Sequence, residues 1–139
     1  MRTVLFVCTG NTCRSPMAEA LLRQKILERG IRDAEAASAG LNVAEGSRLS
    51  PQSRRVLSEN GLELGGFVPR QLTRGMLSSA HMVVTMTEGQ KALLPGSNVF
   101  CVSWFLGAEV PDPYGQGDGE YRRVFRLLSS ACDRIADLL

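Results

Sequence analysis

The fold of this chain is decided by residues 4–16, which read VLFVCTGNTCRSP. Residues 4–7 form a continuous apolar run of β-branched, aliphatic and aromatic side chains. Such a run predicts a strand buried on both faces, as in a parallel sheet. Ser15 and Pro16 suit the N-cap and the first position of a helix. A strand that passes through a short loop directly into a helix is typical of α/β folds.

The rest of the chain repeats this alternation. Apolar residues recur at Ala18, Leu22 and Ile26, which predicts a helix that Gly30 closes. Further strands are expected at 34–38, 82–85 and 99–102, and further helices at 50–61, at 73–79, through 92–93, and from Asp118 along an apolar stripe that reaches Leu139. We therefore predict a single α/β domain over residues 1–139, with a parallel sheet and helices on both faces.

Composition narrows the function classes. The chain has 139 residues and a net charge of +2, which is too small to indicate a nucleic-acid or anionic membrane partner. No stretch approaches the roughly 18 apolar residues that a spanning helix needs, and the N-terminal apolar run is too short for an export signal. The four cysteines do not resemble a secreted disulfide framework, so a reducing cytoplasm is expected.

Cys8 and Arg14 bracket five residues at the end of the first predicted strand. Ligands bind beyond the carboxyl ends of parallel strands, so this loop lies where a site is expected. A thiol attacks as its thiolate, which helix N-termini and nearby cations favour. The Arg14 guanidinium can hold two phosphate oxygens. The pattern predicts a phosphate pocket with Cys8 as the nucleophile at its floor.

The loop itself supplies the rest of the expected phosphate site. Gly10 permits unusual backbone conformations, and Asn11 tolerates the left-handed region, so successive N–H groups can form an anion nest. The hydroxyl of Ser15 either caps the helix or stabilises the Cys8 thiolate, or does both in different steps. The predicted phosphate-binding residues are Thr9, Gly10, Asn11, Thr12, Cys13, Arg14 and Ser15.

Cys13 has more than one interpretation. Spacing from Cys8 allows half of a zinc site, but Cys101 and Cys132 fall in predicted core elements, and His81 is the only histidine. We therefore expect no metal. Cys13 either fills space behind the loop or lies near enough to trap oxidised Cys8 as a reversible disulfide. His81 has no visible partner and is expected to be structural.

Asp112 is the candidate general acid. It lies between Pro111 and Pro113 in the loop after the fourth predicted strand, so it should reach the same sheet edge as Cys8. A carboxyl there can protonate the leaving atom and later activate water. The alternative is an Asp that only forms a turn before proline. Tyr114 either walls the pocket or packs against the last helix, whereas Asp118 is expected to begin that helix.

These motifs resemble the low molecular weight protein tyrosine phosphatases over essentially the whole chain. The resemblance rests on Cys8-x5-Arg14-Ser15, on residues 38–40 (SAG), and on Asp112-Pro113-Tyr114. It implies a four-stranded parallel sheet, a phosphocysteine intermediate at Cys8 and Asp112 as acid and then base. It also implies that Asn11 braces the loop, that no metal or organic cofactor is needed, and that phosphorylated proteins are the substrates. We expect a monomer.

Two positions depart from the common pattern of that family. Thr12 stands where a bulky aliphatic residue is usual, and Gly115 stands where a second aromatic often follows Tyr114. Both are similar to the bacterial protein-arginine phosphatase branch, in which the threonine is associated with phosphoarginine. A hydroxyl on the pocket wall orients polar groups, whereas loss of an aromatic wall weakens stacking on phosphotyrosine. Thr12 and Tyr114 are thus the predicted specificity residues, and phosphoarginine is the favoured substrate over phosphotyrosine.

Two other function classes deserve comparison. An arsenate reductase on this scaffold needs a thiol relay near the third strand, but no cysteine lies between Cys13 and Cys101. A non-catalytic anion-binding or response-regulator-like module would not need both Arg14 and Asp112. Such a phosphoacceptor would also carry a carboxylate where Cys8 stands. The sequence favours the phosphatase.

Overall fold

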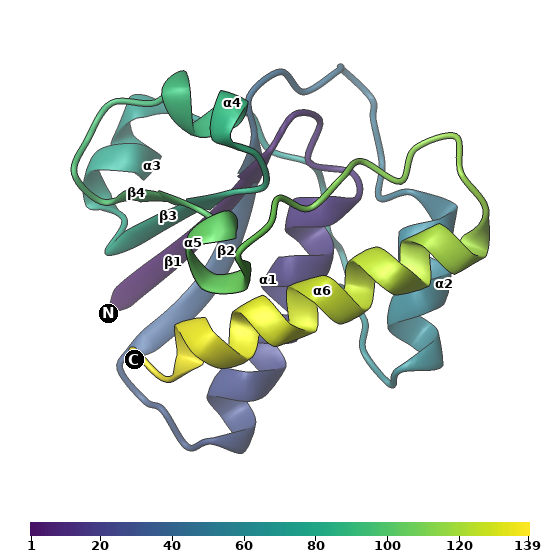
Figure 1. Ribbon diagram of the computed structural model, residues 1–139, viewed down its shortest axis with the longest axis horizontal. Coiled ribbons are helices and arrows are strands. Elements are labelled where there is room, and N and C mark those ends of the chain that lie inside the picture. Colours follow the sequence, from purple (N-terminus) through teal and green to yellow (C-terminus); the bar gives the residue numbers. More distant parts are fainter.

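A computed structural model describes residues 1–139, and Figure 1 shows its ribbon. The strands are β1 (Arg2–Cys8), β2 (Ala34–Gly40), β3 (Met82–Thr85) and β4 (Val99–Cys101). The helices are α1 (Arg14–Glu28), α2 (Pro51–Glu59), α3 (Arg74–Ser79), α4 (Glu88–Ala92), α5 (Ser103–Leu106) and α6 (Asp118–Ala136). Strands and helices alternate along most of the chain, as predicted.

The four strands form one sheet in the order β2-β1-β3-β4, and every pair is parallel. Leu5 of β1 stands opposite Ala37 of β2 and Val83 of β3. Because the strands are parallel, their carboxyl ends meet at one edge of the sheet, and Cys8 of β1 lies beside Gly40 of β2 there. The predicted four-stranded parallel sheet is confirmed.

Helices cover both faces of the sheet, which is also confirmed. Figure 1 shows α1, α2 and α6 together on one side, with α3 and α4 on the other. The larger core lies beneath α1 and α6 and includes Phe6, Leu22 and Leu128. The smaller core lies on the opposite face and includes Leu5 and Val83. No helix combines the length and the apolar character needed to cross a bilayer.

Several boundaries differ from the sequence prediction. Strand β2 continues past Ser38 to Gly40 because residues 38–40 pair with the end of β1. Helix α5 was not predicted, since it is a single turn of four residues (SWFL) that ends at Gly107 in a left-handed conformation. Leu139 lies beyond the end of α6, where its carbonyl accepts a hydrogen bond from the Arg2 guanidinium at 2.9 Å.

Helix α1 begins earlier than the sequence predicted. The sequence predicted Ser15 as the N-cap of α1, and this prediction is wrong. The helix begins at Arg14, with Cys13 in the cap position and no side-chain capping bond. Ser15 lies in the first turn, where its buried hydroxyl contacts Cys8 and Asn11 instead. By contrast, Asp118 does begin α6, where it pairs with Arg55 at 2.6 Å.

Candidate active site

Cys8 is the last residue of β1, and the loop 9–13 connects it to α1. The segment after β2 holds this loop from one side. The Leu41 N–H donates to the Cys8 carbonyl, and the Asn42 N–H donates to the Thr9 carbonyl, both at 2.9 Å. Strand pairing and these two bonds hold the base of the loop firmly at the carboxyl edge of the sheet.

The backbone N–H groups from Thr9 to Ser15 donate to no acceptor in the protein. Successive free N–H groups at a helix N-terminus form a site for an anion. Asn11 is the only residue other than glycine with a positive φ, at 56°. Gly10 does not adopt a positive φ, so the expectation that it supplies the unusual backbone conformation was wrong. Asn11 supplies it.

A buried hydrogen-bond network supports the loop from below. Asn11 Nδ2 donates to Ser15 Oγ at 2.8 Å and to Ser38 Oγ at 3.0 Å. Asn11 Oδ1 accepts from the Arg70 backbone N–H at 2.9 Å. Ser15 Oγ lies 2.9 Å from Cys8 Sγ. Asn11, Ser15 and Ser38 are fully buried, so the loop conformation and the sulfur position are coupled.

Arg14 and Asp112 face each other at the mouth of this loop. Arg14 Nη2 lies 3.9 Å from Asp112 Oδ2, and Arg14 Nη1 donates to the Val110 carbonyl at 3.1 Å. The Arg14 side chain is buried, whereas the Asp112 side chain is 54% exposed. Asp112 Oδ1 also accepts from the Tyr114 N–H at 3.0 Å. The fold thus brings the residues 8, 14 and 112 to one edge of the sheet.

Thr12 and Tyr114 have different surroundings. Thr12 is partly buried, and its carbonyl accepts from the Ser50 N–H at 2.8 Å, which ties the loop to the start of α2. The Tyr114 side chain is 82% exposed, so it does not pack against α6. Tyr114 is therefore free to contact a substrate from solvent.

The remaining cysteines are buried. Burial raises the pKa of the Cys13 thiol to about 12, so this group is a neutral thiol near pH 7 that packs in the core. Burial likewise raises the pKa of Cys132 to about 12. Cys101 is buried at the end of β4. No three His, Cys, Asp or Glu side chains gather in an arrangement that could hold a metal ion.

Four supporting residues were not among the predicted site residues. They are Glu19, Ser38, Arg70 and Gln90. Gln90 Nε2 donates to Thr9 Oγ1 at 3.3 Å while its Oε1 accepts from the N–H groups of residues 86 and 87. Ser38 had a sequence signal in the SAG motif. The others had none, because each contacts a partner that is distant in the sequence: Glu19 bonds to Ser38, Arg70 to Asn11 and Gln90 to Thr9.

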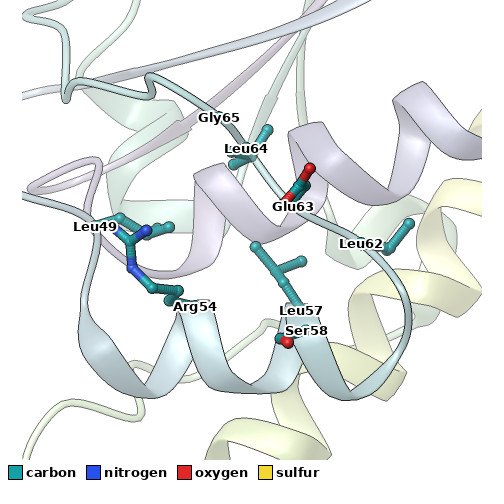
Figure 2. Close-up of a pocket in the computed structure, with 8 residues that line it drawn as sticks. All are labelled: Leu49, Arg54, Leu57, Ser58, Leu62, Glu63, Leu64 and Gly65. Atoms are coloured by element: carbon teal, nitrogen blue, oxygen red, sulfur yellow. The ribbon is translucent and has the colours of Figure 1, made fainter.

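The cavity in Figure 2 is not this site. It has a volume of about 260 Å³ and lies between α2 and the segment 62–65, where Leu57 and Leu62 are among the residues that line it. Cys8, Arg14 and Asp112 do not line it. The candidate site instead lies at the loop 9–15 on the carboxyl edge of the sheet, where the backbone N–H groups have no acceptor in the protein.

Comparison with known proteins agrees with this geometry. Residues 3–139 match the family described as low molecular weight phosphotyrosine protein phosphatase. The chain belongs to this family.

Relatives named as protein-arginine phosphatases and relatives named as protein tyrosine phosphatases both occur among the similar proteins. The chain is 37% identical to a protein-arginine-phosphatase of Geobacillus stearothermophilus, across 98% of this chain and 95% of the relative. The crystal structure of a low molecular weight protein tyrosine phosphatase from T. tengcongensis is 34% identical, with a TM-score of 0.91 and full coverage of both chains. A YwlE arginine phosphatase mutant with a phosphorylated active-site serine is 31% identical, with a TM-score of 0.88 over 99% of this chain and 95% of that one. The protein is therefore a hydrolase of the phosphatase class.

Proposed function

We propose that this phosphatase hydrolyses phosphorylated protein side chains through a phosphocysteine at Cys8, and that phosphoarginine is its preferred substrate. The observation that carries the proposal is the convergence of Cys8, Arg14 and Asp112 at one sheet edge, beside a row of N–H groups without protein acceptors. Each of these features serves phosphoryl transfer. Together they match what a nucleophile, a charge clamp and a proton donor require.

In the first step, the Cys8 thiolate attacks phosphorus and the bond from phosphorus to the leaving nitrogen or oxygen breaks. The free N–H groups of residues 9–15 and the Arg14 guanidinium stabilise the negative oxygens of the transition state. Asp112 gives its proton to the leaving atom, which departs as a neutral guanidine or hydroxyl. Its half-exposed position beside Arg14 leaves it open to the incoming substrate.

In the second step, water attacks the phosphorus of the phosphocysteine. Asp112, now a carboxylate, takes a proton from this water, and the sulfur–phosphorus bond breaks. The Cys8 sulfur leaves as a thiolate, which the Ser15 hydroxyl at 2.9 Å stabilises by hydrogen bonding. Inorganic phosphate is released, and the enzyme returns to its starting state with atoms and charges balanced.

Two residue identities support phosphoarginine as the preferred substrate. Thr12 offers a hydroxyl where an aliphatic side chain would suit an aromatic ring, and Gly115 offers no ring to stack on phosphotyrosine. Similarity to an arginine phosphatase supports the same choice. Tyr114 contributes one exposed aromatic surface, which the stem of an arginine side chain can also contact.

The decisive experiment compares kcat/KM on two peptides of identical sequence that carry either phosphoarginine or phosphotyrosine. We expect the phosphoarginine peptide to be the better substrate. A higher kcat/KM for phosphotyrosine would overturn the substrate assignment while leaving the mechanism intact. Cys8→Ser is expected to abolish turnover of both peptides. Full activity in that variant would contradict the proposed phosphocysteine mechanism.

The variant Asp112→Asn tests the role of Asp112 as proton donor without changing the nucleophile Cys8. A positioned acid accelerates proton transfer to the leaving atom by about 10²–10⁴-fold, so kcat for a substrate with a poor leaving group should fall by about that factor. An aryl phosphate with a very acidic phenol needs little protonation and should be much less affected. Equal losses on both substrates would contradict the role of Asp112 as the proton donor.

A further inference from the structure

We propose that Trp104 and Glu109 bind a basic residue that flanks the phosphorylated side chain of a protein substrate. This inference rests on the proposed function and deepens it, because it adds a feature of the substrate sequence. We call these two residues the substrate rim. Trp104 is the only tryptophan in the chain and is 76% exposed, and Glu109 is also exposed. An indole face and a carboxylate are the two groups that bind a guanidinium or an ammonium group.

The substrate rim lies at the same edge of the sheet as the candidate active site. The Val102 N–H donates to the Thr85 carbonyl at 2.7 Å, and the Val110 N–H donates to the Met86 carbonyl at 3.1 Å. The segment 103–109, which contains both rim residues, therefore leaves the carboxyl end of β3 and returns to it. Strand β3 pairs with β1, whose last residue is the nucleophile. Figure 1 shows α5 at the start of the connection that runs on to α6.

The residues that follow Glu109 contact the catalytic groups directly. The next residue is Val110, whose carbonyl accepts from Arg14 Nη1 at 3.1 Å. Asp112 follows in the same loop, with Oδ2 at 3.9 Å from Arg14 Nη2. A protein substrate that places its phosphate against Arg14 therefore brings its flanking residues close to the substrate rim.

The Glu109 carboxylate is held in place without a cation. Its Oε2 accepts from the Glu88 N–H at 2.6 Å, and the Glu88 carboxylate accepts from Ser103 Oγ at 2.6 Å. The only basic side chain within 4.0 Å of the carboxylates at 88, 109 and 112 is Arg14, which lies 3.9 Å from Asp112. The chain as a whole has a net charge of +2, so this local excess of carboxylates is not a general property of the protein. Fixed carboxylates without ion pairs attract a cation that has no existing partner to displace.

Trp104 supplies an aromatic surface next to these carboxylates. On one side of it in the chain, Ser103 is bound to Glu88. On the other side, Phe105 is buried and packs against Phe100 with ring centroids 6.4 Å apart. Helix α5 is therefore anchored on both sides of Trp104, while the exposed indole adds little to the core. A cation over an exposed indole is stabilised by about two- to fivefold in affinity.

Charge decides which flanking residue fits this surface. An acidic flank would be repelled by Glu109 and Glu88, and an aliphatic flank would gain only the apolar contact with Trp104. Lysine or arginine gains both the carboxylate and the indole. The substrate rim therefore selects protein segments in which basic residues surround the phosphorylated one.

The test compares kcat/KM on three phosphopeptides that carry Lys, Ala or Glu at the two positions on each side of the phosphorylated residue. We expect the order Lys, Ala, Glu, with the Lys peptide about fivefold better than the Ala peptide at low ionic strength. This preference should shrink at about 1 M NaCl, because salt screens exposed charges. The three peptides are made with phosphoarginine and again with phosphotyrosine, so the result is independent of which phosphorylated residue is preferred.

Variants of the rim then assign the preference to its residues. Glu109→Gln keeps an oxygen for the Glu88 N–H but removes the charge, and it should lower the ratio of Lys to Ala peptide kcat/KM by about threefold. Trp104→Ala should lower the same ratio by about two- to fivefold, with partial recovery in Trp104→Phe. Each ratio is measured within one enzyme, so a general loss of activity cancels. Glu28→Gln, an exposed change at the far end of α1, should keep the wild-type ratio.

Two kinds of failure can be told apart in this experiment. Equal kcat/KM for the three peptides would overturn the proposal while leaving the phosphatase activity intact. A preference for the Lys peptide that stays the same in both Glu109→Gln and Trp104→Ala would overturn it as well. Absence of hydrolysis of every peptide by the wild type would instead refute the proposed function.

Discussion

Asn11 is the residue on which the conformation of the phosphate loop depends most, and Asn11→Ala gives the sharpest prediction. This substitution removes the three hydrogen bonds of a buried side chain, which join Asn11 to Ser15, Ser38 and the Arg70 N–H. Each such bond contributes about 1 kcal/mol to stability. Asn11 also has a φ of 56°, where an alanine costs about 1 kcal/mol in strain. We therefore expect the free energy of unfolding to fall by about 4 kcal/mol.

The measurement is urea denaturation in a reducing buffer that contains no phosphate or sulfate, since either anion would stabilise the folded state by binding. Asn11→Gly is the matched control, because glycine adopts this φ without strain while losing the same hydrogen bonds. It should be about 1 kcal/mol more stable than the alanine variant. A loss below about 1 kcal/mol in Asn11→Ala, with no difference from the glycine variant, would refute the account of the loop.

Three further predictions concern other parts of the molecule. Gly40→Ala should lower the free energy of unfolding by about 1–3 kcal/mol and weaken phosphate binding measured by calorimetry. The reason is that a Cβ at this position would lie 2.8 Å from the Thr9 carbonyl oxygen. Unchanged stability and affinity would contradict this prediction. Burial raises the pKa of Cys132 to about 12 in the folded protein. Below the unfolded-state pKa near 9 the thiol is neutral in both states and the folded state keeps its full stability. As the pH rises from 9 toward 12 only the unfolded state ionises, so the free energy of unfolding falls. Wild-type unfolding free energy should therefore fall more steeply between pH 9 and pH 10.5 than that of Cys132→Ala, by up to about 1.4 kcal/mol per pH unit, and parallel curves would exclude this contribution. Thr12→Ile should lower the ratio of phosphoarginine to phosphotyrosine kcat/KM by about tenfold, whereas an unchanged ratio would remove Thr12 as a specificity residue.

Local patterns in the sequence determined most of the fold. The apolar run before Cys8 predicts a buried parallel strand because such a strand must be covered on both faces, and the three- and four-residue spacing of the final helix predicts its buried side. The Cys8–Arg14 spacing and the Asp112 loop could also be found from sequence, since each is a short contiguous motif. Their shared location follows from the rule that loops after parallel strands meet at one edge.

Only the tertiary structure decided what holds the loop. Ser15 suits a helix cap by its residue type, yet its hydroxyl contacts Cys8 and Asn11 because the helix begins two residues earlier, at Arg14. Ser38 and Glu19 join the network from β2 and α1, with no spacing that would indicate a contact. A hydrogen bond between distant segments depends on strand register and helix packing, which are properties of the folded chain as a whole.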